Sequence, residues 1–340
     1  MKKLLAILLI SSLVLIFSCG ETYVFKVPET VGTNWYKGNT HTHTINSDGD
    51  QEPYLVAKWY KDHDYDFLAI TDHNMLTDPD LMKGIQDSGF LLIKGNEVSS
   101  SNKKVPNESH KKTVHMNALN FSSPIQTVYD TTIELTLQEN INAIRAAGGG
   151  VHLNHPNHRW SYGSKEMMQL KNISLFEIYN MHPRVNNYGS DSLESTEQMW
   201  DNMLTAGKRI YGLATDDAHN FLDFTWFNSN PGRGWVVVRA NMLNADEITK
   251  NLEQGHFYAS SGVELDDIIV KPTSIEIKIK PYSQSIYRTD FIGDGGEILK
   301  STYKNPARFE LTSRQSYVRA NIRSSNGQRA WVQPVFVTTQ

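Results

Sequence analysis

Cysteine is nearly absent from the chain, in which Cys19 is the only one among 340 residues. If Cys19 belongs to an N-terminal leader, the rest of the chain has no thiol, which excludes disulfide bonds and thiolate-ligated metal sites. A basic excess is also absent, because 33 Lys and Arg residues stand against 37 Asp and Glu residues, for a net charge of −4. Nucleic-acid binding needs clustered Lys and Arg, so no nucleic-acid partner is expected.

A single long apolar run lies at the N-terminus. Residues 4–17 are apolar except for two serines and follow two lysines. Fourteen residues are too few to span a membrane comfortably, but they match the length of a signal-peptide core. The next residues favour a lipoprotein signal, because Ile16-Phe17-Ser18-Cys19 resembles the bacterial lipobox, in which the cysteine becomes the lipidated N-terminus. Phe17 is an unusual residue at its position in that motif.

We therefore predict a lipoprotein signal peptide at residues 1–19 and a linker at residues 20–34. Lipidated Cys19 would be the only contact with a membrane. The protein would then be anchored in the bacterial cell envelope, on the periplasmic face or at the cell surface. An ordinary signal peptide with an incidental cysteine is the alternative.

From residue 35 to about 220, short apolar runs alternate with helix-like stretches. This alternation predicts an α/β fold with parallel strands, and the number of strands favours a distorted seven-stranded (β/α) barrel over an open sheet. Residues 232–262 are typical of strand, helix and strand, and would close or flank the barrel, giving a first domain at 35–263. The apolar runs are 66–73, 90–97, 114–121, 149–156, 175–180 and 209–219, and the helix-like stretches are 51–62, 78–87, 136–147 and 193–206.

From residue 264 to the end the chain shows only strand patterns. "SIEIKIK" and "YVRANIR" alternate apolar and polar residues, and Asn326-Gly327 between two such runs is a hairpin signal. We predict a small all-β sandwich at 264–340. It contains no histidine, so we expect it to be an accessory domain.

Potential metal ligands stand at the ends of nearly all the apolar runs in the first domain. His41 and His43 are two residues apart and would point to the same side of a strand. In a (β/α) barrel the chemistry lies at the C-terminal ends of the strands, and imidazole and carboxylate donors suit Zn, Mn or Fe. His115 instead begins its run, which predicts a strand antiparallel to its neighbours. For the paired histidines alone, a polar strand end with surface histidines is an equal alternative.

Six segments of the chain resemble, in order, motifs of the PHP (polymerase and histidinol phosphatase) family of metal-dependent phosphoesterases, here of a two-domain bacterial lipoprotein type. The segments are "HTHTINSDG" (41–49), "ITDHN" (70–74), "GNE" (95–97), "VHMNALNF" (114–121), "NHPN" (154–157) and "DDAH" (216–219).

The resemblance implies hydrolysis of a small-molecule phosphate ester by hydroxide activated at a site of two or three divalent ions. It also implies ligand sets, in which Glu97 bridges two ions. The first set would be His41, His43, Glu97 and Asp217, the second Glu97, His115 and His155, and the third Asp48, His73 and His219. We expect Glu97 and Asp217 to be the most important of these for catalysis. Asp72 and Asp216 would orient ligand imidazoles.

Other polar residues are weaker candidates. Arg159 and Arg184 stand on predicted loops beyond the strand ends and would bind a phosphate bidentately. His182 would protonate a leaving group. The remaining histidines have simpler interpretations: His63 at the surface, His152 packed in a strand, His110 in a polar loop and His256 outside the pattern.

Two other functions remain open on the sequence. Amidohydrolases also begin with two histidines on their first strand, but they lack the "TDH", glutamate and "DAH" series. A catalytically inactive barrel with a binding role would be expected to have lost metal ligands, whereas all nine positions here carry suitable donors. The sequence does not identify the substrate, the metal or the oligomeric state.

Overall fold

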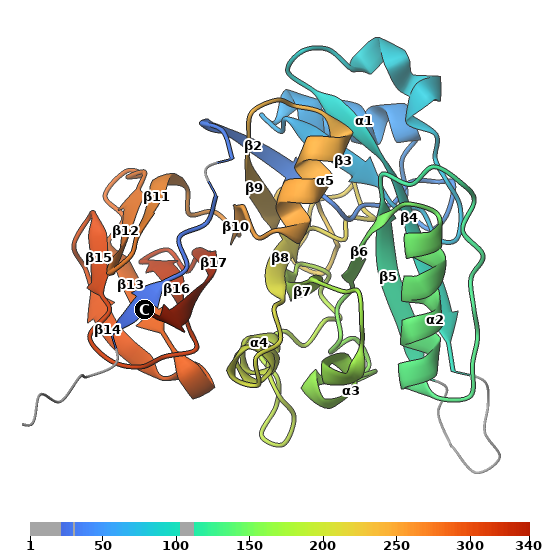
Figure 1. Ribbon diagram of the computed structural model, residues 1–340. Coiled ribbons are helices and arrows are strands. Elements are labelled where there is room, and N and C mark those ends of the chain that lie inside the picture. The colour runs from blue at the N-terminus through green and yellow to red at the C-terminus, as the bar shows by residue number, and fades with distance from the viewer. Residues whose placement is uncertain (1–21, 30, 103–111) are drawn as a thin grey trace, which may run out of the picture.

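The computed structural model describes residues 22–29, 31–102 and 112–340. The predicted signal peptide with Cys19, and also His110, lie outside the described residues. The fold is mixed α/β, and most strands join one large sheet (Figure 1). Within the described ranges, no helix is long and apolar enough to cross a membrane.

The first part of the sheet carries the strands whose ends were predicted to bear ligands. Strands β2, β3 and β4 pair in parallel, as do β6, β7 and β8. Strand β5 is antiparallel to both β4 and β6, which confirms the prediction made from His115. A parallel bridge between Thr42 and Ala218 also brings the chain beyond β2 next to the chain beyond β8. The strands are β2 (Asn34–Asn39), β3 (Phe67–Ile70), β4 (Leu91–Ser101), β5 (Thr113–Leu119), β6 (Gly150–Leu153), β7 (Leu175–Asn180) and β8 (Tyr211–Thr215).

The helices between these strands follow the sequence pattern with two exceptions. Helix α2 shows the expected pattern, because Thr132 caps its first turn and Leu137, Ile141 and Ile144 form a buried face. The stretch predicted as a helix at 78–87 is instead a 3₁₀ helix, η1, with a kink at Met82. The short helix α3 was not predicted. The helices are α1 (Pro53–Asp62), η1 (Pro79–Ile85), α2 (Ile133–Ala146), α3 (Ser164–Gln169) and α4 (Thr196–Thr205).

The predicted strand, helix and strand at 232–262 are β9 (Trp235–Ala240), α5 (Ala245–Glu253) and β10 (Phe257–Ser260). Strand β9 pairs with β2, and β10 pairs with β9. Strand β10 also pairs with β17 near the end of the chain, so the sheet continues without a break into the C-terminal region.

The C-terminal region consists of strands apart from the short 3₁₀ helix η2 (Asp294–Gly296). Strands β13, β14, β16 and β17 extend the large sheet, while β11, β12 and β15 form a second sheet. Phe291 of β13 and Phe309 of β15 pack with their ring centres 5.4 Å apart, so the two sheets share a core. The strands are β11 (Leu265–Lys271), β12 (Ser274–Ile279), β13 (Tyr287–Ile292), β14 (Ile298–Thr302), β15 (Ala307–Glu310), β16 (Tyr317–Ser324) and β17 (Arg329–Thr339).

Three local features tie this region together. The predicted hairpin is confirmed, since β16 and β17 are antiparallel and Gly327 has a φ of 90° in the turn between them. Strand β1 (Tyr23–Phe25) pairs with the far end of β17. Between α4 and β16, buried Asp201 accepts two hydrogen bonds from Arg319, at 2.7 and 2.6 Å.

Candidate metal centre

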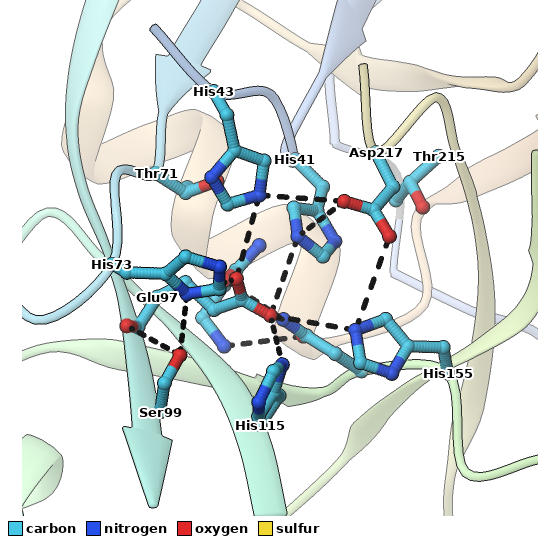
Figure 2. A network of polar contacts seen from close by, with 12 residues as sticks. His41, His43, Thr71, His73, Glu97, Ser99, His115, His155, Thr215 and Asp217 are labelled. Carbon is cyan, nitrogen blue, oxygen red and sulfur yellow. Dashed lines mark hydrogen bonds and ion pairs between the residues drawn. The ribbon is translucent and has the colours of Figure 1, made fainter. Parts of the chain in front are cut away.

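All nine predicted metal ligands gather at one end of strands β2 to β8. His41 and His43 follow β2, His73 follows β3, and His155 follows β6. Glu97 lies inside β4, and because β5 runs in the opposite direction, His115 near its start reaches the same place. The remaining three are Asp48 beyond β2 and Asp217 and His219 beyond β8. Figure 2 shows the rings of His41, His43, His73, His115 and His155 around the carboxylates of Glu97 and Asp217.

Glu97 occupies the centre of this group. Its Oε1 lies 3.0 Å from Nδ1 of His115 and 3.4 Å from Nε2 of both His41 and His155. Its Oε2 lies 2.9 Å from Nδ1 of His73 and 3.4 Å from Nε2 of His43. One buried carboxylate therefore contacts imidazoles from each of the three predicted ligand sets.

Two other carboxylates complete the cluster. Oδ1 of Asp217 lies 3.2 Å from Nε2 of His41 and 3.3 Å from Nε2 of His43. Asp48 lies at the solvent side, with 53% of its side chain exposed, and its oxygens are 3.3 Å from His219 and 3.4 Å from His73.

Among residues 22–29, 31–102 and 112–340, four groups of donors have the geometry to hold a metal ion. They overlap more than the predicted sets do, since His43 belongs to two of them and His155 groups with His41 and Asp217. The groups are His43, Asp48, His73 and His219; His41, His43 and Glu97; His41, His155 and Asp217; and His73, Glu97 and His115.

Unsatisfied buried atoms indicate that the cluster fits cations. Nε2 of His41, Nε2 of His43 and Oε2 of Glu97 are buried, and none makes a hydrogen bond within the described part of the chain. Buried polar atoms without a partner are costly, and here they are metal-ligating atoms aimed at a common centre. Divalent cations bound by imidazole and carboxylate would satisfy them.

Burial and neighbouring charges shift the pKa values of the side chains in the cluster. Burial disfavours the charged form of His41, yet the carboxylates of Asp217 and Glu177 outweigh it and raise the pKa of this imidazole. Burial likewise disfavours the carboxylate of Glu97, but the imidazoles around it hold its pKa well below the usual value. By contrast, burial and the neighbouring His219 lower the pKa of His43 to about 4, so that its ring is neutral at pH 7.

Glu177 is a member of the site that the sequence analysis missed. It is fully buried in β7, and its Oε1 lies 2.6 Å from Nδ1 of His41, while its Oε2 accepts a hydrogen bond from the backbone N–H of His155 at 2.7 Å. Thr215 and Asn180 also donate to it, both at 2.8 Å. Because an ionised carboxylate only accepts, Nδ1 of His41 carries a proton, and in the neutral form of this ring, which can bind a metal, the lone pair of Nε2 faces the cluster.

Glu177 fills the role expected of Asp72 and Asp216, neither of which contacts an imidazole. Asp216 accepts from Tyr60 and from backbone N–H groups at 232–234, which fixes the chain between β8 and β9. Asp72 accepts from Thr44 and Ser47, and only Ser47 reaches His43, at 3.3 Å. Both carboxylates therefore shape the loops around the site and do not orient its rings directly.

The candidate substrate residues line the mouth of the cluster. An open cavity of about 170 Å³ is bordered by the cluster and by His158, Arg159, His182 and Arg184. An antiparallel bridge between His158 and Val185 joins the two loops that carry these residues. Nδ1 of His182 accepts from the backbone N–H of Arg184 at 3.2 Å, which leaves the proton of the neutral ring on Nε2. Burial lowers the pKa of His182.

The other histidines lie apart from the cluster centre. His63 is exposed and stacks on Trp59 with ring centres 3.8 Å apart, which confirms its surface position. His152 is fully buried in β6, as predicted. His256 precedes β10, away from the cluster.

The fold and the donor cluster define a protein with a histidine and carboxylate centre suited to divalent metals. Among solved structures, the chain is similar to a two-domain protein from Bacteroides vulgatus that contains a predicted PHP-like metal-dependent phosphoesterase. That match has a TM-score of 0.50 and 15% identity, and it covers 91% of this chain and 98% of the other. The resemblance to the PHP family seen in the sequence is therefore confirmed at the level of the fold.

Two further structures are less similar. A candidate metal-dependent phosphoesterase from Bifidobacterium adolescentis gives a TM-score of 0.38 at 16% identity, covering 57% of this chain and 89% of the other. An amidohydrolase from Chromobacterium violaceum gives 0.38 at 13% identity, covering 54% of this chain and 87% of the other. No family model and no curated protein matches the chain.

Proposed function

We propose that the protein is a metal-dependent phosphoesterase that hydrolyses a small phosphate ester at a site of two or three divalent ions. The observation that carries the proposal is the convergence of nine imidazole and carboxylate side chains on one site, where three buried ligand atoms make no hydrogen bond within the described part of the chain. When bound, such ions supply an acidified water and positive charge beside the phosphoryl oxygens.

Residues at the centre of the site and residues at its mouth would have different roles. Glu97 and Asp217 contact the imidazoles of the cluster and would supply the negative charge that holds the cations. Arg159 and Arg184, at the mouth, would bind the phosphate through bidentate hydrogen bonds. The neutral ring of His182 presents its Nε2 proton, and an approaching phosphate dianion would stabilise the charged form and allow it to serve as a proton donor.

The same proposal covers the finer architecture. We infer that β2 to β8 form the distorted seven-stranded barrel, supported by the bridge between Thr42 and Ala218. We infer likewise that β11 to β17 form the small β-sandwich, supported by the contact between Phe291 and Phe309.

The alternatives make different predictions. An amidohydrolase-like enzyme would use the same ions but would cleave amides or lactones. An inactive barrel would bind a ligand without turnover. The complete donor set argues against it, because an inactive barrel would be expected to have lost metal ligands.

Metal analysis combined with a substrate panel tests the proposal. The purified protein should hold at least two divalent ions and hydrolyse aryl phosphates, and it should leave aryl amides and lactones intact. Glu97→Ala should lose most bound metal and turnover, because it removes a donor from two predicted sets. Glu310→Ala, at an exposed position on β15, should keep both. Wild-type metal content and phosphatase activity in Glu97→Ala would refute the proposed centre.

A further inference from the structure

A second cavity shares the loop after β7 with the metal cavity. It has a volume of about 290 Å³ and is bordered by α4, by the loop after β7 and by β16 and β17. Val185 lines the metal cavity and Asn187 lines the second one. Two residues span at most about 7 Å of extended chain, so one short stretch of this loop separates the two cavities.

The C-terminal sheet carries a row of three arginines, two of which line this cavity. Arg323 on β16 is directly opposite Arg329 on β17, and on its other side it is directly opposite Arg288 on β13. Directly opposed residues on neighbouring strands point to the same face, and like charges in such pairs are destabilising. Such an unfavourable pairing of like charges is expected at functional positions.

The outer two arginines of the row have acidic partners within the protein. Arg288 donates to Asp290 at 2.8 Å and to Ser301 at 3.2 Å. Arg329 donates to Glu197 at 3.2 Å. The side chain of Arg323, between them, is exposed and makes no hydrogen bond or ion pair with any described residue.

Glu197 is already shared by three hydrogen-bond donors and by an ion pair with Arg319, whose Nη2 lies 3.6 Å from its Oε2. Its two oxygens already accept from Asn321 and Trp331, both at 3.1 Å, and from Arg329. The next acidic group, Asp201, is bound bidentately by Arg319. The three guanidinium groups of β16 and β17 therefore face two carboxylates, which leaves one positive charge in excess at the cavity.

We propose that Arg323 and Arg329 bind a second anionic group, a carboxylate or a phosphate, on the same substrate whose phosphate ester lies at the metal centre. This inference rests on the proposed phosphoesterase function. Guanidinium groups match the planar geometry of carboxylates and phosphates, and they bind both bidentately. Tyr188 is 65% exposed at this cavity and supports Arg329 through a contact of 5.1 Å to its ring, so the cavity also offers an aromatic surface to the part of the substrate between the two anions.

Calorimetric titration of the metal-loaded full chain with inorganic phosphate tests the site itself. Wild type should bind two phosphates per chain, one at each cavity. Arg323→Gln should lose one of them, and Glu97→Ala should lose the other. Arg288→Gln is the matched control, because it belongs to the same row but does not line the cavity, and it should bind two. Wild-type stoichiometry in Arg323→Gln would overturn the proposal.

A pair of substrates tests the connection to catalysis. Glucose 6-phosphate and 6-phosphogluconate share a phosphate ester, but only the second carries a carboxylate. Wild type should favour 6-phosphogluconate in kcat/KM by tenfold or more, and this preference should disappear in Arg323→Gln and remain in Arg288→Gln.

The outcomes separate the two proposals. Loss of one phosphate in Arg323→Gln with an unchanged substrate preference would make the anion an independent ligand and would overturn the link to the substrate. If wild type hydrolyses no phosphate ester and Glu97→Ala loses no phosphate, the proposed function fails, while loss of phosphate in Arg323→Gln would still uphold the arginine site.

Discussion

The strongest single test of how the fold prepares the metal centre is substitution of Glu177, which touches two predicted ligands and is not one itself. Its carboxylate accepts four hydrogen bonds, including those from His41 and from the backbone of His155. Each buried donor left without an acceptor costs about 1–3 kcal/mol. Glu177→Ala would leave several buried donors without an acceptor. The summed cost would be a large share of the free energy of unfolding of a typical domain, which is roughly 5–15 kcal/mol.

Glu177→Gln is therefore the more informative change. A glutamine keeps the shape of the side chain but has one oxygen, so it can accept from His41 only by turning its own N–H groups toward the donors of His155 and Asn180. We expect the free energy of unfolding to fall by about 1–3 kcal/mol. Because a glutamine cannot accept from both His41 and the backbone of His155, one of these two ligands loses its fixed position, and Zn²⁺ affinity should fall by roughly 10–100-fold.

The assays are competitive chelator titration for Zn²⁺ affinity and urea unfolding of the metal-free protein for stability. Asp201→Asn is the matched control, since Asp201 is also a buried carboxylate with charged partners but contacts Arg319 on the C-terminal sheet. It should lose stability and keep wild-type affinity. If Glu177→Gln behaves like Asp201→Asn in both assays, Glu177 supports the fold only and the orienting role is wrong.

Three further predictions follow from the geometry. Metal binding should release protons, because Glu97 and Asp48 raise the pKa of His73 to about 10 despite its burial. Metal affinity should therefore fall as the pH falls. Calorimetric titrations in two buffers of different ionisation enthalpy test this, and equal heats would contradict it. Asp48→Ala should reduce turnover less than Glu97→Ala, since Asp48 is 53% exposed and contacts the imidazoles of His43, His73 and His219 from the solvent side, whereas Glu97 is buried at the centre of the cluster; equal losses in aryl phosphate assays would contradict this. Cys19→Ala should move the protein from the membrane to the soluble fraction, and retention at the wild-type level would refute the lipid anchor.

The convergence of the nine predicted ligands could be predicted because it depends on local rules. Strand ends in a parallel sheet meet at one edge, so His41, Glu97 and Asp217 could be brought together without knowing any long-range contact. The antiparallel direction of β5 followed from the same logic, because His115 begins its run. The overlap of the donor groups could not be predicted, since it depends on rotamers and loop geometry that no periodicity encodes.

Glu177 was missed although its sequence held a usable signal. It lies between Phe176 and Ile178 in a run with the character of a strand buried on both faces. A carboxylate in such a strand is costly without partners, so its presence indicates a buried polar cluster. The error was to require donors at strand ends only, when a residue three places before the end of β7 can reach the same site.

The arginine row shows where sequence reasoning ends for a different reason. The Asn326-Gly327 turn sets the register of β16 and β17 and so places Arg323 opposite Arg329, which the hairpin signal alone could have indicated. Their position next to the metal cavity depends on α4 and on the loop after β7, which are more than a hundred residues away in the sequence. Only the tertiary structure brings these elements together.

The continuous sheet joins the C-terminal region, predicted as an accessory domain, to the first domain. Strand β17 covers the edge of β10, with Tyr258 opposite Val332 and Ala259 opposite Trp331. A chain ending at Gly262 would expose that edge and leave buried Asp201 without Arg319, and breaking a buried ion pair of this kind costs about 3–5 kcal/mol. We therefore expect such a chain to unfold at lower urea concentration than the full protein or to aggregate through its free edge. If the shortened chain were monomeric, as stable as the full protein and fully loaded with metal, the boundary near residue 263 would separate two independent domains and the shared sheet would contribute nothing to the site.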